Sequence, residues 1–230
     1  MSNCVLRIRN LSKVYSSGAG SVAALQDVSL EFKKGEFVAI VGPSGSGKST
    51  LLNLIGVLDQ PTSGSVEVAG IPVGSLPDWE KALIRNRLIG FIFQSYNLIQ
   101  RTTVINNVTL PGIIYHGRRT GLRERARKLL STMGIADKEQ NRPTQLSGGE
   151  QQRVAIARSL INDPPIILAD EPTGNLDSKN GNDVFQLLKR LTTQLGRTVI
   201  MVTHNPEMAA AVDRAIYIRD GVVEREDIRN

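Results

Sequence analysis

The residues Gly42-Pro43-Ser44-Gly45-Ser46-Gly47-Lys48-Ser49-Thr50 set the architecture expected of the whole chain, because they fit the pattern G-x-x-x-x-G-K-[ST]. An apolar run at residues 37–41 precedes them, and a helix-like run at residues 51–58 follows. A buried strand then leads into a glycine-rich turn whose backbone N–H groups converge on phosphate oxygens at the positive end of a helix. In this arrangement Lys48 reaches the β- and γ-phosphates and the Ser49 hydroxyl ligates Mg²⁺. Residues 42–50, hereafter the phosphate loop, therefore predict nucleotide binding rather than a glycine- and serine-rich loop without a ligand.

Length and composition limit the class of protein. A chain of 230 residues fits one domain, with or without an inserted subdomain. Because no apolar run is long enough to span a membrane or act as a signal peptide, we expect a soluble intracellular protein. Cys4 is the single cysteine, which excludes an intramolecular disulfide and a zinc cluster. The net charge of +6 suits nucleic acid, an anionic membrane surface or solubility, and it does not choose among them.

The N-terminal part predicts β-structure. Residues 5–8 and 28–32 have the composition of short strands, and residues 33–36 that of a turn into the strand before the phosphate loop. Tyr15 lies between the first two strands and is followed by a run at residues 16–21 that we expect to be flexible. Its ring is either an ordinary half-buried aromatic or a platform for a nucleotide base, and both readings stay open here.

The middle of the chain predicts a helical insertion. A strand at residues 65–68, a helix start near Pro77 and a strand at residues 90–93 that ends on Gln94 lead to a mostly helical stretch from residue 96 to 145. This stretch contains the densest basic cluster of the chain: Arg118, Arg119, Arg123, Arg125, Arg127 and Lys128. We interpret the cluster as the solvated face of an amphipathic helix in preference to a specific contact site.

A second helix start able to meet an anion follows this insertion. Ser147, Gly148, Gly149 and Glu150 directly precede a helix whose apolar positions include Val154. Two glycines at a helix start can present backbone N–H groups and a helix dipole to an anion. Ser147 and Glu150 also fit the capping box, so the two interpretations are compatible.

Polar residues then follow two buried strands of the C-terminal half. Residues 166–169 are apolar and run into Asp170 and Glu171, whose carboxylates would emerge at the carboxyl edge of a parallel sheet. There Asp170 suits Mg²⁺ and Glu171 suits the polarisation of a water molecule. Successive strand residues point in opposite directions, so we expect the two acids to have different roles. His204 follows the strand at residues 198–202 and reaches the same edge.

The C-terminal end of the chain predicts a hairpin. Residues 215–218 and 222–223 read as its two strands, and Asp220-Gly221 as its turn. The charged tail from Glu224 onward is expected to fray.

These motifs together resemble the nucleotide-binding subunit of an ATP-binding cassette (ABC) transporter over nearly the whole chain. The phosphate loop, the stretch Leu146 to Glu150 with its continuation to Ala155, and the strand at residues 166–171 occur in the family's order and approximate spacing. The resemblance implies an α/β fold: a P-loop NTPase core with a mostly parallel central sheet, an N-terminal antiparallel β subdomain and an inserted helical subdomain. It further implies one ABC ATPase domain over residues 1–230, with the helical subdomain at about residues 95–163 in the RecA-like core. Residues 146–150 are hereafter the signature segment.

The resemblance also implies roles for single residues around ATP and Mg²⁺. Tyr15 corresponds to the aromatic that stacks on adenine, and Gln94 to the glutamine that senses Mg²⁺ and the permease. Asp170 is similar to the carboxylate on the metal side, Glu171 to the general base and His204 to the residue that contacts the γ-phosphate.

Pairing of two copies is a further implication of the resemblance. Asp177 belongs to the loop that communicates across the dimer. In the family, Ser147, Gly148 and Gly149 of one subunit, with Glu150 beside them, close over ATP held by the phosphate loop of the other subunit. Two identical sites would then form in a head-to-tail homodimer.

Two longer stretches, residues 90–98 and 164–177, resemble the lipoprotein-releasing and macrolide-exporting subfamily. This implies an ATPase on the cytoplasmic face of a membrane that powers a separate permease. A regulatory cassette that controls a membrane complex without transport shares the same ATP chemistry and stays open as an alternative. A cassette that acts on nucleic acid is disfavoured, because such proteins carry coiled-coil insertions or two cassettes. Residues 100–101 and 106–108 depart from the family pattern, so the resemblance names no permease and no substrate.

Overall fold

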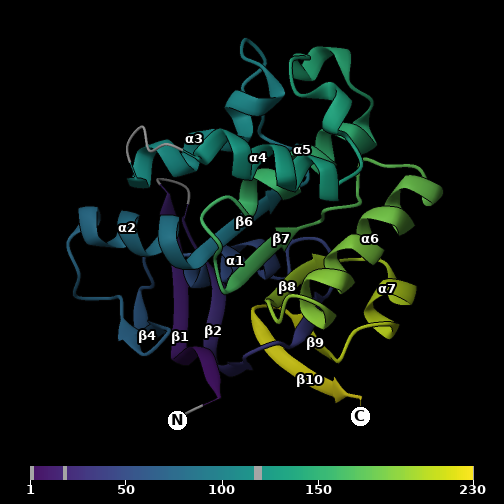
Figure 1. Ribbon diagram of the computed structural model, residues 1–230. Helices are drawn as coiled ribbons and strands as arrows, with labels where there is room; N and C mark the ends of the chain where they lie inside the picture. Colours follow the sequence, from purple (N-terminus) through teal and green to yellow (C-terminus); the bar gives the residue numbers. More distant parts are fainter. Residues whose placement is uncertain (1–2, 18–19, 117–120, 230) are drawn as a thin grey trace.

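Parallel strands form the centre of the larger sheet in the computed structural model, which describes residues 3–17, 20–116 and 121–229. This six-stranded sheet has the order β10-β9-β3-β8-β7-β6 (Figure 1). Its strands are β3 (Phe37–Val41), β6 (Ile89–Phe93), β7 (Ile166–Asp170), β8 (Thr198–Thr203), β9 (Arg214–Arg219) and β10 (Val222–Ile228). All neighbouring pairs are parallel except β9 and β10, which are antiparallel. The carboxyl ends of β3, β6, β7 and β8 therefore meet at one edge, where such sheets bind ligands.

The smaller sheet is antiparallel and has the order β2-β1-β4-β5. Its strands are β1 (Cys4–Ser17), β2 (Gly20–Lys33), β4 (Ser63–Val68) and β5 (Ile71–Pro72). The expectation of a flexible run at residues 16–21 is wrong for the four residues that pair across the hairpin, Ser16 with Ser21 and Ser17 with Gly20. Residues 18 and 19 of this run lie outside the described residues. Backbone pairing extends this hairpin although residues 14–16 and 21–23 are exposed, so no apolar alternation marks its full length.

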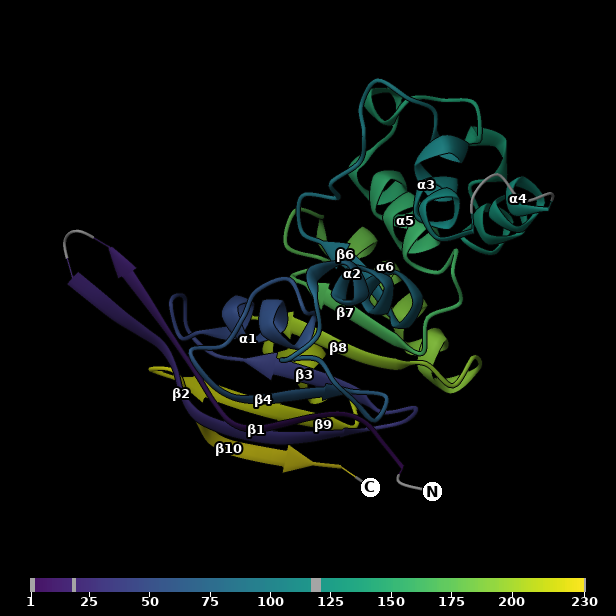
Figure 2. The same cartoon turned by 90° about the vertical axis from the view of Figure 1, so that its left-hand side faces the viewer.

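Helices cover the larger sheet on one face and lie between the two sheets on the other. Their bounds are α1 (Lys48–Ile55), α2 (Asp78–Leu88), α3 (Val104–His116), α4 (Leu122–Thr132), α5 (Gly148–Ser159), α6 (Ser178–Thr193) and α7 (Pro206–Ala210). Figure 2 shows α3, α4 and α5 gathered at one end of the molecule, away from β1, β2 and β4.

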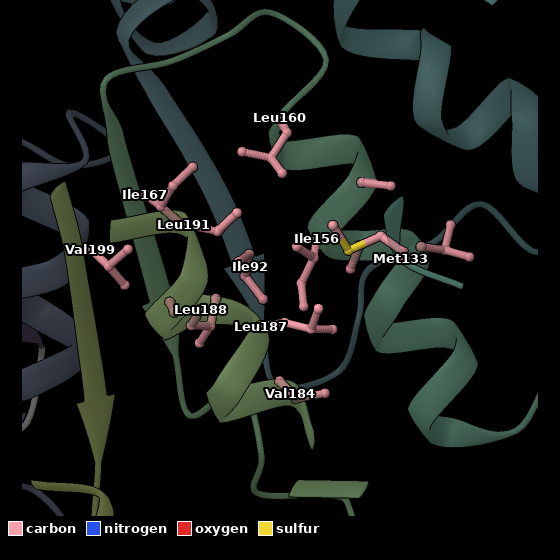
Figure 3. Packing of buried hydrophobic residues seen from close by; sticks show 14 of the residues in the cluster. Ile92, Met133, Ile156, Leu160, Ile167, Val184, Leu187, Leu188, Leu191 and Val199 are labelled. Atoms are coloured by element: carbon pink, nitrogen blue, oxygen red, sulfur yellow. The ribbon is translucent and has the colours of Figure 1, made fainter. Parts of the chain in front are cut away.

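Alternate residues of the parallel strands divide the interior into two cores. Val38 and Ile40 of β3 pack with the residues of α1 and the smaller sheet. Ala39 of the same strand packs on the opposite face, in the cluster formed with α3, α4, α5 and α6. Figure 3 shows this second cluster, in which Ile156 of α5 and Leu188 of α6 converge with side chains of the strands. The sheet therefore separates α1, which follows the phosphate loop, from α5, which begins at the signature segment.

The region expected to be mostly helical between residues 96 and 145 is so only in part. Residues 94–103 form turns and irregular backbone, α3 and α4 follow, and two short 3₁₀ turns span Ala136–Lys138 and Pro143–Gln145. The apolar repeat of α4 buries Ala126, Leu130 and Met133. In the basic cluster, Arg125 and Arg127 bind Asp163 and Glu139, while Arg118 and Arg119 lie outside the described residues.

The C-terminal hairpin is longer than its apolar residues indicate. Asp220 (φ 49°) and Gly221 (φ 79°) are both left-handed, as a two-residue hairpin turn requires. The prediction of a frayed tail is wrong, because β10 pairs with β9 as far as Ile228. Arg214 stabilises this pairing by donating from Nε to a Glu226 carboxylate oxygen at 2.7 Å.

The predicted α/β fold class is confirmed by the mostly parallel sheet, the antiparallel N-terminal sheet and the helices that follow β6. Within the described ranges, every helix is too short or too polar to cross a lipid bilayer.

Candidate active site

The phosphate loop connects β3 to α1 as the sequence pattern predicts. Gly45 (φ 77°) and Gly47 (φ 101°) adopt left-handed backbone that side chains disfavour. A Cβ atom at Gly47 would lie 2.3 Å from the carbonyl oxygen of Ala24, and one at Gly42 would lie 2.1 Å from that of Ile218. Glycine is therefore required at positions 42 and 47 by the close approach of β2 and β9 to the loop.

Lys48 opens α1 and turns back over the loop. Its side chain is buried, and its Nζ donates a hydrogen bond of 2.6 Å to the carbonyl oxygen of Pro43. The ammonium thus lies within the turn whose backbone N–H groups would hold phosphate oxygens.

Ser49 and Asp170 meet at the carboxyl edge of the sheet. Ser49 Oγ donates to Asp170 Oδ1 at 3.3 Å, which joins the start of α1 to the end of β7. Burial raises the pKa of the Asp170 carboxyl; the Ser49 hydrogen bond opposes this rise, and the charge of Glu171 adds to it. A cation near this carboxylate would relieve the cost of its buried charge.

Gln94 follows β6, whose last residue, Phe93, pairs with Asp170 of β7. The side-chain Nε2 of Gln94 lies 3.4 Å from Oδ1 of Asn175, whose Nδ2 donates to the Gln94 carbonyl oxygen at 3.0 Å. Hydroxyl, carboxylate and amide oxygens are hard ligands of the kind that Mg²⁺ prefers, and Mg²⁺ takes few of them from the protein. The residue types around Ser49 therefore fit Mg²⁺ and do not fit a softer metal.

Glu171 and His204 form a second pair beside the first. His204 Nδ1 lies 3.3 Å from Glu171 Oε2, and the two residues directly follow β7 and β8. Glu171 has left-handed backbone (φ 43°), and its N–H donates to the carbonyl oxygen of Val202 at 3.1 Å. Strand β7 ends at Asp170, so Glu171 belongs to the turn that follows and strand alternation does not set the direction of its side chain. Residues held in such backbone concentrate at functional sites.

Asp177 lies in the loop between β7 and α6. It caps α6 by accepting from the N–H of Asn180 at 3.0 Å and from its Nδ2 at 2.6 Å. These backbone and side-chain hydrogen bonds from Asn180 lower the pKa of the Asp177 carboxyl. Glu171, Asp177 and His204 together line a cavity of about 440 Å³.

The signature segment begins α5 with both features that its sequence indicates. Ser147 Oγ accepts from the N–H of Glu150 at 3.3 Å, and a Glu150 carboxylate oxygen accepts from the N–H of Ser147 at 2.8 Å, so the capping box is formed. A Cβ atom at Gly148 would lie 2.8 Å from the Tyr96 hydroxyl, and one at Gly149 would lie 2.8 Å from Asn180 Oδ1. The two glycines thus let the loop after Gln94 and the start of α6 pack directly on the signature segment.

Tyr15 lies on β1 with 43% of its surface exposed. Its hydroxyl donates to Asp59 Oδ2 at 2.9 Å, which ties the ring to the segment that follows α1. The ring is therefore fixed at one end and open to a ligand.

The structure brings most of the predicted site residues to one edge of the sheet. The phosphate loop, Gln94, Asp170, Glu171 and His204 follow β3, β6, β7 and β8, and Asp177 joins them through its cavity. The signature segment does not join this group across the sheet, because α1 and α5 pack on opposite faces.

Two residues of this neighbourhood escape the sequence interpretation. Asn175 holds both the side chain and the backbone of Gln94, and its only sequence signal is its place in a glycine-containing turn. Arg158 of α5 donates to the carbonyl oxygens of Tyr96 and Asn97, both of which are left-handed. Burial lowers the pKa of Arg158, and a charged residue within the apolar run of α5 could have drawn attention to it.

Comparison with known proteins identifies the family. The ABC transporter family pattern matches residues 25–174. An uncharacterized ABC transporter ATP-binding protein of Methanocaldococcus jannaschii is 50% identical over 97% of both chains. The lipoprotein-releasing system ATP-binding protein LolD of Bordetella pertussis is 45% identical over 94% of both chains. The macrolide export ATP-binding/permease protein MacB of Chlorobaculum tepidum is 50% identical over 95% of this chain, which spans only 33% of that relative.

Solved structures of ATP-binding cassettes have the same fold as this chain. One is the ATP-binding cassette of the M. jannaschii protein, solved as a dimer in a post-hydrolysis state bound to ADP and Pi. Its TM-score is 0.91 at 48% identity, and the match covers 98% of this chain and 99% of that chain. CbiO1 of Clostridium perfringens, part of an ABC transporter complex, has a TM-score of 0.86 at 27% identity over 99% of this chain and 89% of its own. The chain therefore belongs to the ABC transporter family, as an ATP-binding cassette that hydrolyses ATP.

Proposed function

We propose that two copies of this chain pair head to tail and hold each ATP between the phosphate loop of one copy and the signature segment of the other. The observation that carries this proposal is the separation of the two helix starts: α1 and α5 lie on opposite faces of one sheet. Each start has the N–H groups and dipole that favour an anion, so one chain offers two half-sites for different nucleotides. The M. jannaschii cassette is a dimer in its post-hydrolysis state, which supports the pairing of two copies.

The chemistry needs positioning and charge neutralisation more than covalent catalysis. Lys48 and the N–H groups of the phosphate loop hold the β- and γ-phosphates. Bound Mg²⁺, ligated by Ser49 and Asp170 with Gln94 beside them, would neutralise negative charge on the phosphate oxygens. The 3.3 Å contact between Ser49 Oγ and Asp170 Oδ1 supports this assignment, because it places both oxygens close enough to ligate one ion at the end of the phosphate loop.

Glu171 is the general base, and its carboxylate accepts the proton of the attacking water. His204 contacts the γ-phosphate and, at 3.3 Å from Glu171 Oε2, keeps that carboxylate turned toward the same point. The contact of Glu171 with His204 at the carboxyl edge of the sheet supports this role. A base within reach of the water and of the phosphate contact is the geometry that proton abstraction needs.

Asp177 and Gln94 transmit the state of the site to the neighbouring chains. Asp177 shares the cavity of Glu171 and His204 and lies at the start of α6, so it is placed to meet the second copy. Asn175 connects this loop to Gln94 by the bonds described above. A movement of the loop that carries Asp177 is therefore passed through Asn175 to Gln94.

A mixing experiment tests whether two copies build each site. Lys48→Ala removes the phosphate contact, and Ser147→Arg blocks the signature segment, so each variant alone forms pairs with two defective sites. In an equal mixture about half of the random pairs contain both variants and carry one intact site of two. We expect ATP hydrolysis to recover toward about a quarter of the wild-type rate, because each intact site needs one residue set from each chain.

The control is each variant assayed alone at the total protein concentration of the mixture. A mixture that hydrolyses ATP no faster than its two parents contradicts the shared site.

An integral membrane permease docks in a groove beside Gln94. The groove has a volume of about 410 Å³ and lies between α2, β6, α3 and α5. Phe91 and Phe93 stack in it with ring centroids 5.7 Å apart, and Ile114 at its rim is 70% exposed. An apolar groove with an exposed aliphatic rim suits an apolar helix of the partner, in the manner of helix-in-groove recognition. The cassette would then work on the cytoplasmic face of the membrane, driving export or lipoprotein release, or acting as a mechanical transmitter.

Ile114→Asp tests this docking surface, because it places a charge at the rim of an apolar groove. We expect the variant to lose most of the membrane protein that co-purifies with the wild-type chain, while its ATP affinity is unchanged. Leu195→Asp is the matched control, since Leu195 is also exposed (54%) but lies between α6 and β8. Equal recovery of the membrane protein with both variants contradicts the proposed groove.

A further inference from the structure

Two side chains, those of Asp59 and Lys13, contact the Tyr15 side chain, whose ring would meet the base of the nucleotide. Tyr15 donates its hydroxyl hydrogen to Asp59 Oδ2 at 2.9 Å. The other carboxylate oxygen, Oδ1, accepts from Lys13 Nζ at 2.8 Å and from the N–H of Gln60 at 2.7 Å. Lys13 Nζ also donates to the carbonyl oxygen of Gln60 at 2.7 Å. Both carboxylate oxygens of Asp59 are therefore occupied, and the hydroxyl of Tyr15 has a fixed acceptor.

Lys13 also contacts the Tyr15 ring through its ammonium group. Its ammonium nitrogen lies 4.8 Å from the ring centroid, within the range of a cation–π contact. The Lys13 side chain is only 12% exposed, so its hydrogen bonds to Asp59 and Gln60 hold the ammonium in place. The Lys13 ammonium thus lies over the ring, and 43% of the Tyr15 surface stays exposed for contact with a planar ligand.

The electrostatics agree with this geometry. Burial opposes ionisation of Asp59, yet hydrogen bonds from Lys13, the Gln60 N–H and Tyr15 lower the pKa of its carboxyl below the ordinary value. Burial raises the pKa of the Tyr15 hydroxyl and the Asp59 hydrogen bond adds to the rise, while the Thr50 side chain acts in the opposite direction. Asp59 is therefore charged and accepting, and Tyr15 is neutral and donating.

The segment that carries Asp59 is joined to the phosphate loop by α1 and to the strand of Tyr15 by hydrogen bonds. It follows α1, an eight-residue helix about 12 Å long that starts at the phosphate loop. Further along, Thr62 ties the segment to β1: its Oγ1 accepts from the N–H of Val14 at 2.9 Å, and its N–H donates to the carbonyl oxygen of Ser12 at 2.9 Å. Helix α1 thus links the position of the phosphates to the position of the ring.

We propose that Asp59 is a positioning residue for the nucleobase, which acts with Lys13 to hold the Tyr15 ring at a fixed distance from the phosphate loop. This inference rests on the proposed ATP site and on the role that the family resemblance implies for Tyr15, the ring that stacks on adenine. Asp59 does not touch the nucleotide; it orients the ring through the hydroxyl. Its contribution is therefore specific to ligands that carry a base.

A double-mutant cycle with two ligands tests this role. Asp59→Asn keeps the shape of the side chain without its charge, and Tyr15→Phe keeps the ring without its hydroxyl. We expect each variant to bind a labelled ATP analogue roughly threefold to tenfold more weakly, as loss of one hydrogen bond predicts. The affinity for inorganic tripolyphosphate, measured by competition, is expected to stay unchanged, and the double variant to bind ATP no more weakly than the weaker single variant.

The same measurements separate the possible failures. If Asp59 only stabilises the fold, Asp59→Asn weakens ATP and tripolyphosphate alike and adds to Tyr15→Phe, which overturns the inference. If Tyr15→Ala weakens ATP binding and Asp59→Asn does not, the inference alone is overturned. If Tyr15→Ala leaves ATP affinity unchanged, the stacking role of Tyr15 fails and the inference fails with it. Asp78→Asn is the matched control, because the side chain of Asp78 is 94% exposed and its ion contact with Lys81 is long, 3.8 Å.

Discussion

Replacing Glu171 with glutamine will reduce ATP turnover by about a hundredfold or more, the range typical of losing a general base. Glutamine preserves the size of the side chain and its position after β7, but it cannot accept a proton from water. ATP binding and the ATP-induced pairing of two chains should persist, because Lys48 and the phosphate loop are untouched. The measurement is phosphate release at saturating ATP, together with light scattering of the variant with ATP and without it.

Glu224→Gln provides the control for this variant. Glu224 is an exposed carboxylate on β10, paired with Arg219 at 3.5 Å and far from the ends of β7 and β8 in the sheet order. Its substitution removes the same charge, and we expect wild-type turnover. Unchanged turnover in Glu171→Gln would remove Glu171 from the role of general base.

Lys48→Ala will weaken ATP binding by roughly tenfold to a hundredfold, because the variant loses a charged hydrogen-bond donor at the phosphates. In the structure Lys48 Nζ already lies in the phosphate loop, where its bond to the Pro43 carbonyl oxygen keeps it over the turn. The affinity is measured by titration with a labelled ATP analogue.

Lys34→Ala removes an equal charge from an exposed turn before β3 and should leave ATP affinity unchanged. A loss of unfolding free energy in Lys48→Ala without loss of ATP affinity would point to a structural role of the buried lysine and would contradict the predicted phosphate contact.

The site was predictable where its signals are local in the sequence. The phosphate loop carries its own pattern, and the apolar runs before Asp170 and His204 indicate buried parallel strands whose ends share one edge. The capping box of Ser147 and Glu150 depends on two residues three positions apart, so it too was predictable.

Features that depend on contacts between distant parts of the chain were not predictable in this way. The distal part of the β1–β2 pairing, which joins Val14, Tyr15 and Ser16 to residues 21–23, rests on backbone pairing between exposed residues, which leave no buried apolar pattern. The left-handed backbone of Glu171 is imposed by the turn that follows β7 on the way to α6, and glutamate has no preference for this conformation. Asp59 lies in an ordinary polar turn, and only the folded chain brings it to Tyr15, 44 positions earlier.

The central sheet, by keeping α1 and α5 on opposite faces, also determines how the reaction rate depends on the amount of protein. In the proposed pairing a single chain supplies only half of each of two nucleotide sites, a phosphate loop for one and a signature segment for the other. Free chains in dilute solution must therefore dimerise before they hydrolyse ATP, and turnover per chain rises with protein concentration. A membrane partner that holds two copies converts this encounter into an intramolecular one, with an effective concentration in the millimolar range. The membrane complex would then control hydrolysis by proximity alone, before any change of shape within a chain.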